Sequence, residues 1–233
     1  MLALALLLSA VAVGAAAQPE AVAERIQGRV DELRRESGLT GLDGDERLRE
    51  AARNFAGYMA RTGEYGHRAD GRTPAERAGA EGYEHCIVSE NIARAYDSTG
   101  FTNAGLARQL VRGWVDSPEH RDSLLDPWLT ETGVAVARSG RSGRWYAVQM
   151  FGRPKSMRIT FEVANQTSAA IGYRLGDRRF RLPPRIIRSH ADCRPQPLRM
   201  DRTAGSRADA MRPVDGERFV VVEGKNGPRL RRD

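Results

Sequence analysis

The spacing of the apolar residues changes once along this chain, near Asp126-Pro127, and this change limits the fold more than any other feature. Before the dipeptide, apolar residues recur every three or four positions, as they do on one face of an amphipathic helix. After it, they alternate with their neighbours, which is typical of β-strands. Because proline disfavours helical geometry in the residue before it, Asp126-Pro127 ends the last helix. This order predicts an α+β protein whose helices precede its strands.

Five helices are predicted, two of them from local start signals. Thr73-Pro74-Ala75-Glu76 combines a capping threonine, a proline at the first helical position and a glutamate three residues after the cap. Ser117-Pro118 is a second start signal. It places His120 in the first turn of the following helix, where the helix dipole favours the neutral imidazole. The other helices follow apolar stripes: Val22, Ile26, Val30 and Leu33, with Arg25, Arg29, Arg34 and Arg35 interspersed; Leu48, Ala52, Phe55 and Met59; and Leu106, Leu110 and Trp114.

Two strands, 132–137 and 144–151, follow the helices, joined by a turn at 139–143. Both faces of the second strand carry apolar residues, so we expect helices on both sides of its sheet. Residues 20–152 are therefore predicted to form one three-layer domain. After a linker at 153–155, residues 153–233 are predicted to form a small, mostly-β extension with an antiparallel sheet, with strands at 157–164, 171–175, 178–182, 185–188 and 219–223. The polar stretch 198–216 is expected to be partly disordered.

The first 17 residues have the features of a signal peptide. They are apolar and small, and they end in Ala15-Ala16-Ala17, which resembles a signal-peptidase site. No Lys or Arg precedes the apolar run, which raises an upstream start codon as an alternative. The run is short for a membrane span, so no transmembrane segment is expected after processing. A buried N-terminal helix is the weaker alternative because no polar residues mark one face. We expect a secreted or periplasmic protein.

The net charge of +7 is built mainly from arginines spread along the chain and interleaved with acidic residues. A Lys/Arg block with aromatic partners, as nucleic-acid binders carry, is absent before the short tail Arg229-Leu230-Arg231-Arg232. No nucleic-acid partner is therefore expected. We interpret the basicity as solubility together with attraction to anionic surfaces, such as envelope polymers or lipid head groups.

Cys86 and Cys193 are the two cysteines of the chain. In an oxidising compartment such a pair favours one disulfide, which would close a loop of more than a hundred residues and attach the β extension to the first domain. In the chain-entropy model a loop of this length contributes about 4–5 kcal/mol. The alternative is two buried free thiols. His85 and His190, each near a cysteine in the sequence, are expected at the surface; the alternative is metal binding by this set of cysteines and histidines.

His67, Glu90 and His120 stand out as candidate site residues from three different segments. Two imidazoles and a carboxylate suit a zinc ion with an open coordination position, or acid–base catalysis. Their spacing matches no HExxH-type motif. The alternative is that each histidine is structural, hydrogen-bonded to a carboxylate or to the backbone.

A set of short motifs, in order along 23–152, resembles the CAP superfamily of cysteine-rich secretory, antigen 5 and pathogenesis-related 1 proteins, and its bacterial SCP-like branch in particular. The motifs are Leu48-x-x-Ala51-Ala52-Arg53-x-Phe55-Ala56-x-x-Met59, Gly66-His67, Ser89-Glu90-Asn91-Ile92-Ala93, Trp114-x-x-Ser117-Pro118-x-His120-Arg121-x-x-Leu124-Leu125, Thr132-Gly133-Val134 and Trp145-Tyr146-x-x-Gln149-x-Phe151-Gly152.

This resemblance implies an α-β-α sandwich with a central cavity lined, in many members, by two histidines and two glutamates. The motifs assign His67, Glu90 and His120 to three of these positions. The second glutamate position corresponds to Ser117, so the site loses one carboxylate; Glu119 lies close by but is not equivalent. The resemblance leaves a zinc site formed by His67 and His120, with Glu90 as a third ligand, and a metal-free network in which Glu90 bridges the imidazoles.

Three functions follow from these expectations. The first is an exported, monomeric and non-catalytic binding module whose His/Glu-lined cavity takes a small amphiphilic or lipid-like ligand, or which engages an envelope partner. The second is a peptidase or esterase that uses metal-activated water or a His/Glu pair, with Ser89 or Ser117 as conceivable nucleophiles. The third is a structural envelope protein. No Gly-x-Ser-x-Gly elbow supports the second.

Overall fold

The computed structural model describes residues 16–201, 210–225 and 227–233 and divides them into two compact units. The first unit runs to Tyr83 and resumes at Val88–Phe151, and the second combines Glu84–Ile87 with Gly152–Asp233. The predicted signal peptide, apart from its last two alanines, lies outside the described residues, as does the stretch 202–209 of the segment predicted to be disordered.

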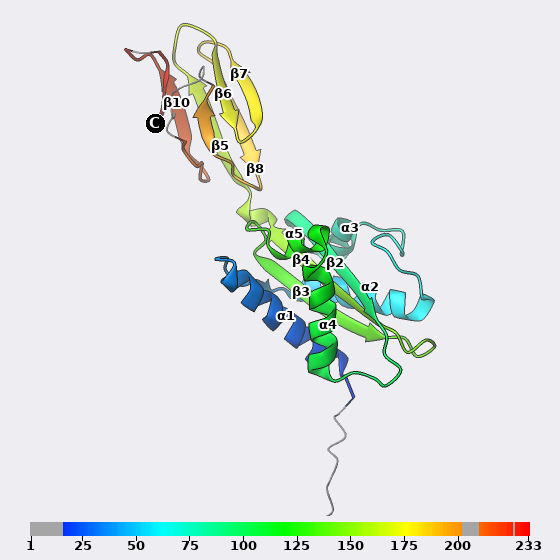
Figure 1. Ribbon diagram of the computed structural model, residues 1–233. Helices are drawn as coiled ribbons and strands as arrows, with labels where there is room; N and C mark the ends of the chain where they lie inside the picture. Colours follow the sequence, from blue (N-terminus) through cyan, green and yellow to red (C-terminus); the bar gives the residue numbers. More distant parts are fainter. Residues whose placement is uncertain (1–15, 202–209, 226) are drawn as a thin grey trace, which may run out of the picture. The chain divides into compact units, whose positions relative to one another are not determined.

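The first unit is built on a four-stranded sheet with helices on both sides (Figure 1). Its strand order is β1-β3-β4-β2, and β1 pairs with β3 in parallel. The strands are β1 (Asp43–Gly44), β2 (His85–Ala95), β3 (Glu131–Arg138) and β4 (Trp145–Pro154), and the helices are α1 (Pro19–Glu36), α2 (Glu46–Thr62), α3 (Pro74–Ala80), α4 (Asn103–Val115) and α5 (Pro118–Leu124). In Figure 1, α1 and α4 lie in front of the sheet and α2 lies behind it. The predicted three-layer α-β-α sandwich is confirmed.

Helix α2 packs against the sheet through its predicted apolar stripe. Phe55 and Met59 are fully buried in one cluster with Tyr146 and Val148 of β4. The helix also lies so close to β3 that a Cβ added to Gly133 would meet the backbone nitrogen of Arg49 at 2.1 Å. Only glycine permits this approach, which explains the residue in the Thr132-Gly133-Val134 motif.

Helix α1 departs from its predicted stripe at one position. Leu33 is only half-buried, whereas Arg34, predicted among the interspersed arginines, is buried next to Val30. Its guanidinium donates hydrogen bonds to backbone carbonyl oxygens of the segments that follow α1 and α5: Thr40 at 2.9 Å, Leu124 at 2.8 Å, Asp126 at 3.1 Å and Leu129 at 3.2 Å. Arg34 thus fixes two turns to α1.

Strand β2 was not predicted, because Ser89-Glu90-Asn91 interrupts any simple alternation of apolar residues. The structure buries Glu90 and Asn91 within the strand. Glu90 pairs with Arg77, and the Asn91 side-chain nitrogen donates to the backbone carbonyl of His120, whereas Asn91 Oδ1 has no hydrogen-bond partner among the described residues. The strand therefore carries site residues at positions where a purely structural strand would carry apolar ones.

The second unit contains two sheets whose facing sides share one apolar core. The strand orders are β11-β10-β5-β8 and β7-β6-β9. The strands are β5 (Ile159–Asn165), β6 (Ile171–Leu175), β7 (Arg178–Leu182), β8 (Ile187–Asp192), β9 (Leu198–Met200), β10 (Arg218–Val222) and β11 (Arg229–Arg232), and a 3-10 turn, η1 (Lys155–Met157), precedes β5. The pairs are antiparallel except β10–β5, which is parallel.

The predicted strands at 171–175, 178–182 and 219–223 are confirmed to within one residue, but β8 begins at Ile187 rather than Arg185. Strand β9 and the tail strand β11 were not predicted. Leu198, at the start of the stretch expected to be disordered, is fully buried in the core of this unit. Its apolar partners are far away in the sequence, so the polar residues around Leu198 gave no indication that it is buried.

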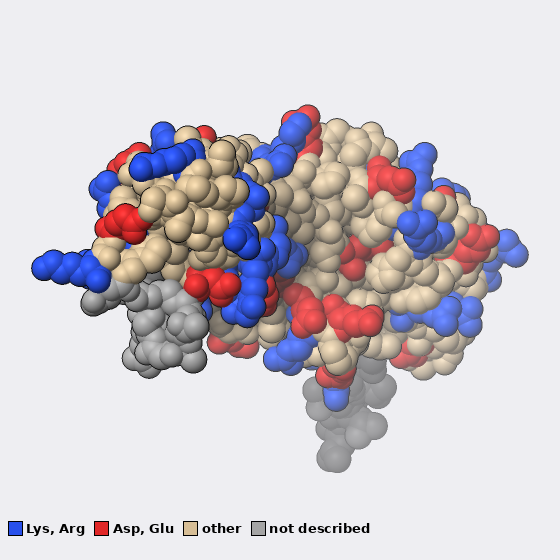
Figure 2. All heavy atoms as spheres, turned by 90° about the horizontal axis from the view of Figure 1, so that it is seen from above, with Lys and Arg blue, Asp and Glu red and all other residues tan. Residues whose placement is uncertain are grey.

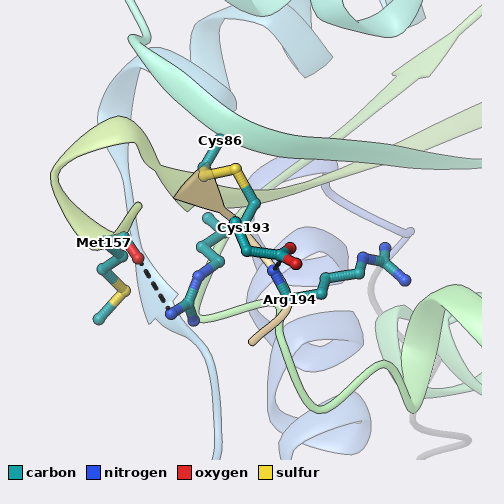
Figure 3. The surroundings of a disulfide bond; sticks show 6 residues. Cys86, Met157, Cys193 and Arg194 are labelled. Carbon is teal, nitrogen blue, oxygen red and sulfur yellow. Dashed lines mark hydrogen bonds between the residues drawn. A yellow bond between two sulfur atoms is a disulfide. The ribbon is translucent and has the colours of Figure 1, made fainter. Parts of the chain in front are cut away.

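The predicted disulfide between Cys86 and Cys193 is confirmed, with a Cα–Cα distance of 5.6 Å (Figure 3). The alternative of two free thiols is therefore wrong. Cys86 is the second residue of β2, and the segment Glu84–Ile87 packs with the second unit, which also contains Cys193. Met157, labelled beside the disulfide in Figure 3, accepts a hydrogen bond from Arg153 at 3.2 Å through its backbone carbonyl.

Candidate functional site

The first unit brings His67, Glu90 and His120 together from three elements. His67 lies in the segment between α2 and α3, Glu90 in β2, and His120 in the first turn of α5. Nδ1 of His67 lies 2.8 Å from Oε1 of Glu90. The ring centroids of the two histidines are 6.3 Å apart. The sequence motifs therefore select residues that are neighbours in the fold.

Residues of β2 on either side of Glu90 hold α5 in place. The Asn91 side-chain amide donates to the backbone carbonyl of His120 at 3.0 Å. Ser89 and Ser123 share a hydroxyl–hydroxyl hydrogen bond of 2.6 Å. The indole nitrogen of Trp114 donates to the carbonyl of Ile92 at 2.9 Å. The Ser-Glu-Asn-Ile motif thus contacts α4 through Ile92 and α5 through Ser89 and Asn91, and it positions the second imidazole.

Glu90 is held mainly by an arginine that the sequence motifs did not include. Both carboxylate oxygens accept hydrogen bonds from Arg77 of α3, at 2.8 and 3.0 Å. The exposed fraction of the side chain is 0% for Glu90 and 4% for Arg77, whereas His67 is 47% exposed. The carboxylate is therefore a buried, paired anion with an exposed imidazole on one side.

Arg77 links the whole segment between α2 and α3. It forms an ion pair of 2.7 Å with Asp70 and donates to the backbone carbonyls of Arg72 and His67 at 2.9 and 2.8 Å. Its guanidinium lies over the ring of Phe55, 3.6 Å from the centroid. This arrangement fixes the backbone of His67 while neutralising Glu90.

His120 is half-buried and its Nδ1 has no hydrogen-bond partner among the described residues. Burial lowers the pKa of His120 below its ordinary value; His67 adds to this lowering and Glu119 opposes it. The neutral imidazole was predicted from the helix dipole, but the structure attributes it first to burial.

The donor set does not fit the zinc site formed by His67, His120 and Glu90. Both carboxylate oxygens of Glu90 accept hydrogen bonds from Arg77, and one of them also contacts His67. Glu90 therefore orients the imidazole rather than acting as a metal ligand. Two imidazoles alone fall short of the three protein ligands of a typical catalytic zinc site. Within the ranges the structure describes, no group of three or more His, Cys, Asp or Glu side chains is arranged to hold a metal ion.

Ser117 occupies the N-cap position of α5, as predicted, but its hydroxyl makes no capping hydrogen bond. No hydrogen bond joins its side chain to His67, Glu90 or His120. Ser89 is paired with Ser123 rather than with an imidazole. Neither serine therefore has the general base that an activated nucleophile requires.

A groove between α1 and α4 is a second candidate binding feature of the first unit. It encloses about 470 Å³, and Leu33, Val111 and Val115 supply its apolar wall. Arg112 on its rim pairs with Asp116 at 3.5 Å, whereas Arg29 and Arg108 form no ion pair with a described residue. The remaining lining residues are Glu32 and Glu36.

Arg77 and Asp70 are the site residues that sequence reasoning missed. One signal for Arg77 exists: after its first residue, Pro74, the helix Pro-Ala-Glu-Arg-Ala-Gly-Ala carries no apolar side chain larger than alanine. A helix without such an anchor must dock through something else, and the only other long side chain is Glu76, which is used in the predicted and confirmed capping box.

An α-β-α sandwich that presents a histidine before its third helix, a Glu-Asn pair in β2 and a second histidine at the start of α5 defines the class of SCP-like domains. The model of the cysteine-rich secretory protein family, CAP, matches residues 27–151. The chain belongs to the CAP family. No curated protein matches it.

Three solved structures illustrate the similarity. An outer surface protein from Borrelia burgdorferi is 19% identical, with a TM-score of 0.51, over 61% of this chain and 100% of its own. An extracellular SCP-domain protein from Bacillus anthracis is 22% identical, with a TM-score of 0.49, over 58% and 41%. A cysteine-rich secretory protein from Staphylococcus aureus is 21% identical, with a TM-score of 0.45, over 58% and 39%. This chain thus matches less than half of the last two proteins.

Helices long and apolar enough to cross a membrane are absent from the part of the chain that the structure describes.

Proposed function

We propose that this protein is exported and acts as a non-catalytic binding module for an anionic amphiphile. The observation that carries the proposal is the groove between α1 and α4, which combines an apolar wall with arginines that lack acidic partners. An acyl chain would contact Leu33, Val111 and Val115, while Arg29 or Arg108 would pair with its acidic head group. The family membership and the small apolar N-terminal segment support export.

The histidine site supports binding rather than hydrolysis. A hydrolase needs a free carboxylate, an activated nucleophile or a metal-bound water near the scissile bond. Here Glu90 is neutralised by Arg77, and Ser89 contacts another hydroxyl. If Nδ1 of His67 donates to Glu90, its Nε2 is left to accept a hydrogen bond from a polar ligand. We therefore assign His67 and His120 to recognition of a polar group at a site of their own, since neither histidine lines the groove. Ser117 is the small residue in the second glutamate position.

The groove is tested with the mature protein and a dansyl-labelled fatty acid, whose fluorescence rises in an apolar site. We expect saturable binding that unlabelled fatty acid displaces. Val115→Glu places a negative charge in the apolar wall, and we expect at least a tenfold loss of affinity. Val115→Leu is the matched control, since it keeps the wall apolar, and its affinity should stay within about twofold of wild type.

A second pair of measurements separates binding from hydrolysis. His120→Ala should leave fatty-acid affinity nearly unchanged, and zinc titration of the wild type at micromolar metal should show no stoichiometric uptake. Stoichiometric zinc that is lost in both His67→Ala and His120→Ala, together with ester or peptide turnover, would replace the proposal by the hydrolase. Equal fatty-acid binding by wild type and Val115→Glu would show that the groove is not the binding site.

A further inference from the structure

The outer face of the three-stranded sheet in the second unit is almost entirely arginine. Along β6, Tyr173 and Leu175 point into the core, so Gly172 and Arg174 point outward. By the same alternation, Arg179 and Arg181 of β7 and Arg199 of β9 share this outer face; all three are exposed. Figure 2 shows Lys and Arg side chains gathered along one side of the second unit, and both charge signs interspersed over the first.

Three of these arginines stand in register across the sheet. Arg174 pairs with Arg179 on β7 and with Arg199 on β9. Neighbouring strands lie about 4.8 Å apart, so the row presents a positive charge at each strand. Like charges directly opposite each other destabilise a sheet. A row of this kind is therefore unfavourable for folding, and the presence of these arginines calls for a reason other than stability.

The acidic residues near this face do not neutralise the row. Asp177 approaches Arg174 only to 4.0 Å and is fully exposed in the β6–β7 turn. The Asp201 side chain lies beside Gly172, where a Cβ added to the glycine would meet the Asp201 Cβ at 3.1 Å. Arg179 and Arg199 form no ion pair with any residue in the described ranges. By contrast, Arg178, which points the other way, pairs with Asp192 at 2.5 Å.

We propose that this arginine row, defined as Arg174, Arg179 and Arg199 with Arg181 beside it, binds a carboxylate-bearing polysaccharide chain. Guanidinium groups match carboxylates in a planar, bidentate geometry. A polyuronate carries one carboxylate on every sugar. Such a chain can lie across the three strands, so that its regularly spaced carboxylates meet the regularly spaced arginines. A row of exposed side chains on the outer face of a sheet suits an extended polymer better than a small anion, which would bind in a hollow.

The same face lacks the features that other polyanions use. Single-stranded nucleic acids stack their bases on aromatic side chains, and the aromatic residues of this sheet, Tyr173 and Phe180, belong to the core side. Anionic membranes are bound by basic residues together with apolar side chains that enter the interface. The outer positions of β6, β7 and β9 contain only arginine and glycine.

The experiment measures binding of fluorescently labelled oligogalacturonate to the mature protein by polarisation, at increasing salt. The test variant is Arg174→Gln/Arg179→Gln/Arg199→Gln. The control variant is Arg25→Gln/Arg35→Gln/Arg141→Gln, which removes the same charge from exposed positions of the first unit. We expect at least a tenfold loss of affinity and a shallower salt dependence in the test variant, and less than a twofold change in the control.

Three results would overturn the proposal. Equal losses in both triple variants would mean that net charge alone drives binding. Tighter binding of single-stranded DNA, or of vesicles containing phosphatidylglycerol, than of oligogalacturonate would assign the row to another partner. Wild-type affinity in the test variant would exclude the row altogether. The thermal midpoint of the test variant checks folding, and we expect it to stay the same or rise because like charges have been removed.

Discussion

The two units use arginine in opposite ways. In the first unit, Arg34 and Arg77 are buried, and each joins several segments through backbone carbonyls or carboxylates. In the second unit, Arg174, Arg179 and Arg199 stand in register on an outer face, with like charges opposite one another. The same side chain is thus a fixed internal connector in one unit and an available ligand group in the other. The difference lies in how many protein acceptors surround each guanidinium.

The largest effect on stability is expected at Arg77. Arg77→Met removes the partner of buried Glu90 and of Asp70, and we expect the free energy of unfolding to fall by about 3–5 kcal/mol. Chemical denaturation of the first unit measures the change. The double variant Arg77→Met/Glu90→Gln no longer buries an unpaired charge, so it should regain a substantial part of the loss. Equal destabilisation in both variants would show that Arg77 acts through packing on Phe55 alone.

Arg34 comes next. Arg34→Met keeps the length of the side chain but leaves the carbonyls of Thr40, Leu124 and Leu129 without their donor. An unsatisfied buried acceptor costs about 1–3 kcal/mol, and we expect a total loss of about 3 kcal/mol because water reaches part of the site. The neighbouring Arg35→Met is the control, because Arg35 is exposed, and it should stay within about 0.5 kcal/mol of wild type.

The sequence contains different amounts of information about these two arginines. Arg34 continues the spacing Val22-Ile26-Val30 by four residues, so strict periodicity places it on the buried face. We nevertheless predicted Leu33 there, because an arginine on an apolar stripe is normally exposed. Arg77 has only the indirect signal of a helix without an apolar anchor. Its acceptors, Glu90 and Asp70, come from separate segments, and only tertiary structure brings them together.

In the rest of the fold, too, features set by local sequence were predicted and features set by distant partners were not. The α2 stripe, the capping box of α3 and the β6–β7 pair follow from local periodicity and turn residues, and they were predicted. The polar strand β2, the buried Leu198 and the parallel β10–β5 pair depend on partners far along the chain, and they were not. The motifs selected His67, Glu90 and His120 correctly as neighbours, but they gave no indication that Glu90 is neutralised.

A smaller effect is expected at His190, which was predicted at the surface but is half-buried between the two sheets. It stacks on Phe161, with ring centroids 5.0 Å apart, and its Nε2 lies 2.6 Å from the Tyr173 hydroxyl. Burial lowers the pKa of His190, Arg188 and Arg178 lower it further, and Asp192 opposes them. Tyr173, whose pKa is raised by burial, can then donate to the neutral ring.

The sign of the pH dependence follows from this lowered pKa. Because the unfolded chain binds the proton more readily than the folded one, the second unit is most stable above the ordinary histidine pKa and loses stability as the pH falls below it. Thermal melts of wild type and His190→Phe between pH 7.5 and 5 test this. The wild type should lose more stability than the variant across this range. Parallel curves would exclude His190 as the titrating group.

The smallest effect is expected in the arginine row. Arg179 is exposed and faces Arg174 across the β6–β7 pair, so Arg179→Gln removes a repulsion and no ion pair with a described residue. We expect a change in the free energy of unfolding within about 0.5 kcal/mol, in the stabilising direction. Arg178→Gln, one residue away, is the matched control because it breaks the ion pair with Asp192, and it should be neutral or destabilising. If Arg179→Gln destabilised the protein as much as Arg77→Met does, the arginine row would be a structural element. Ligand binding would then no longer be needed to explain why these arginines face one another.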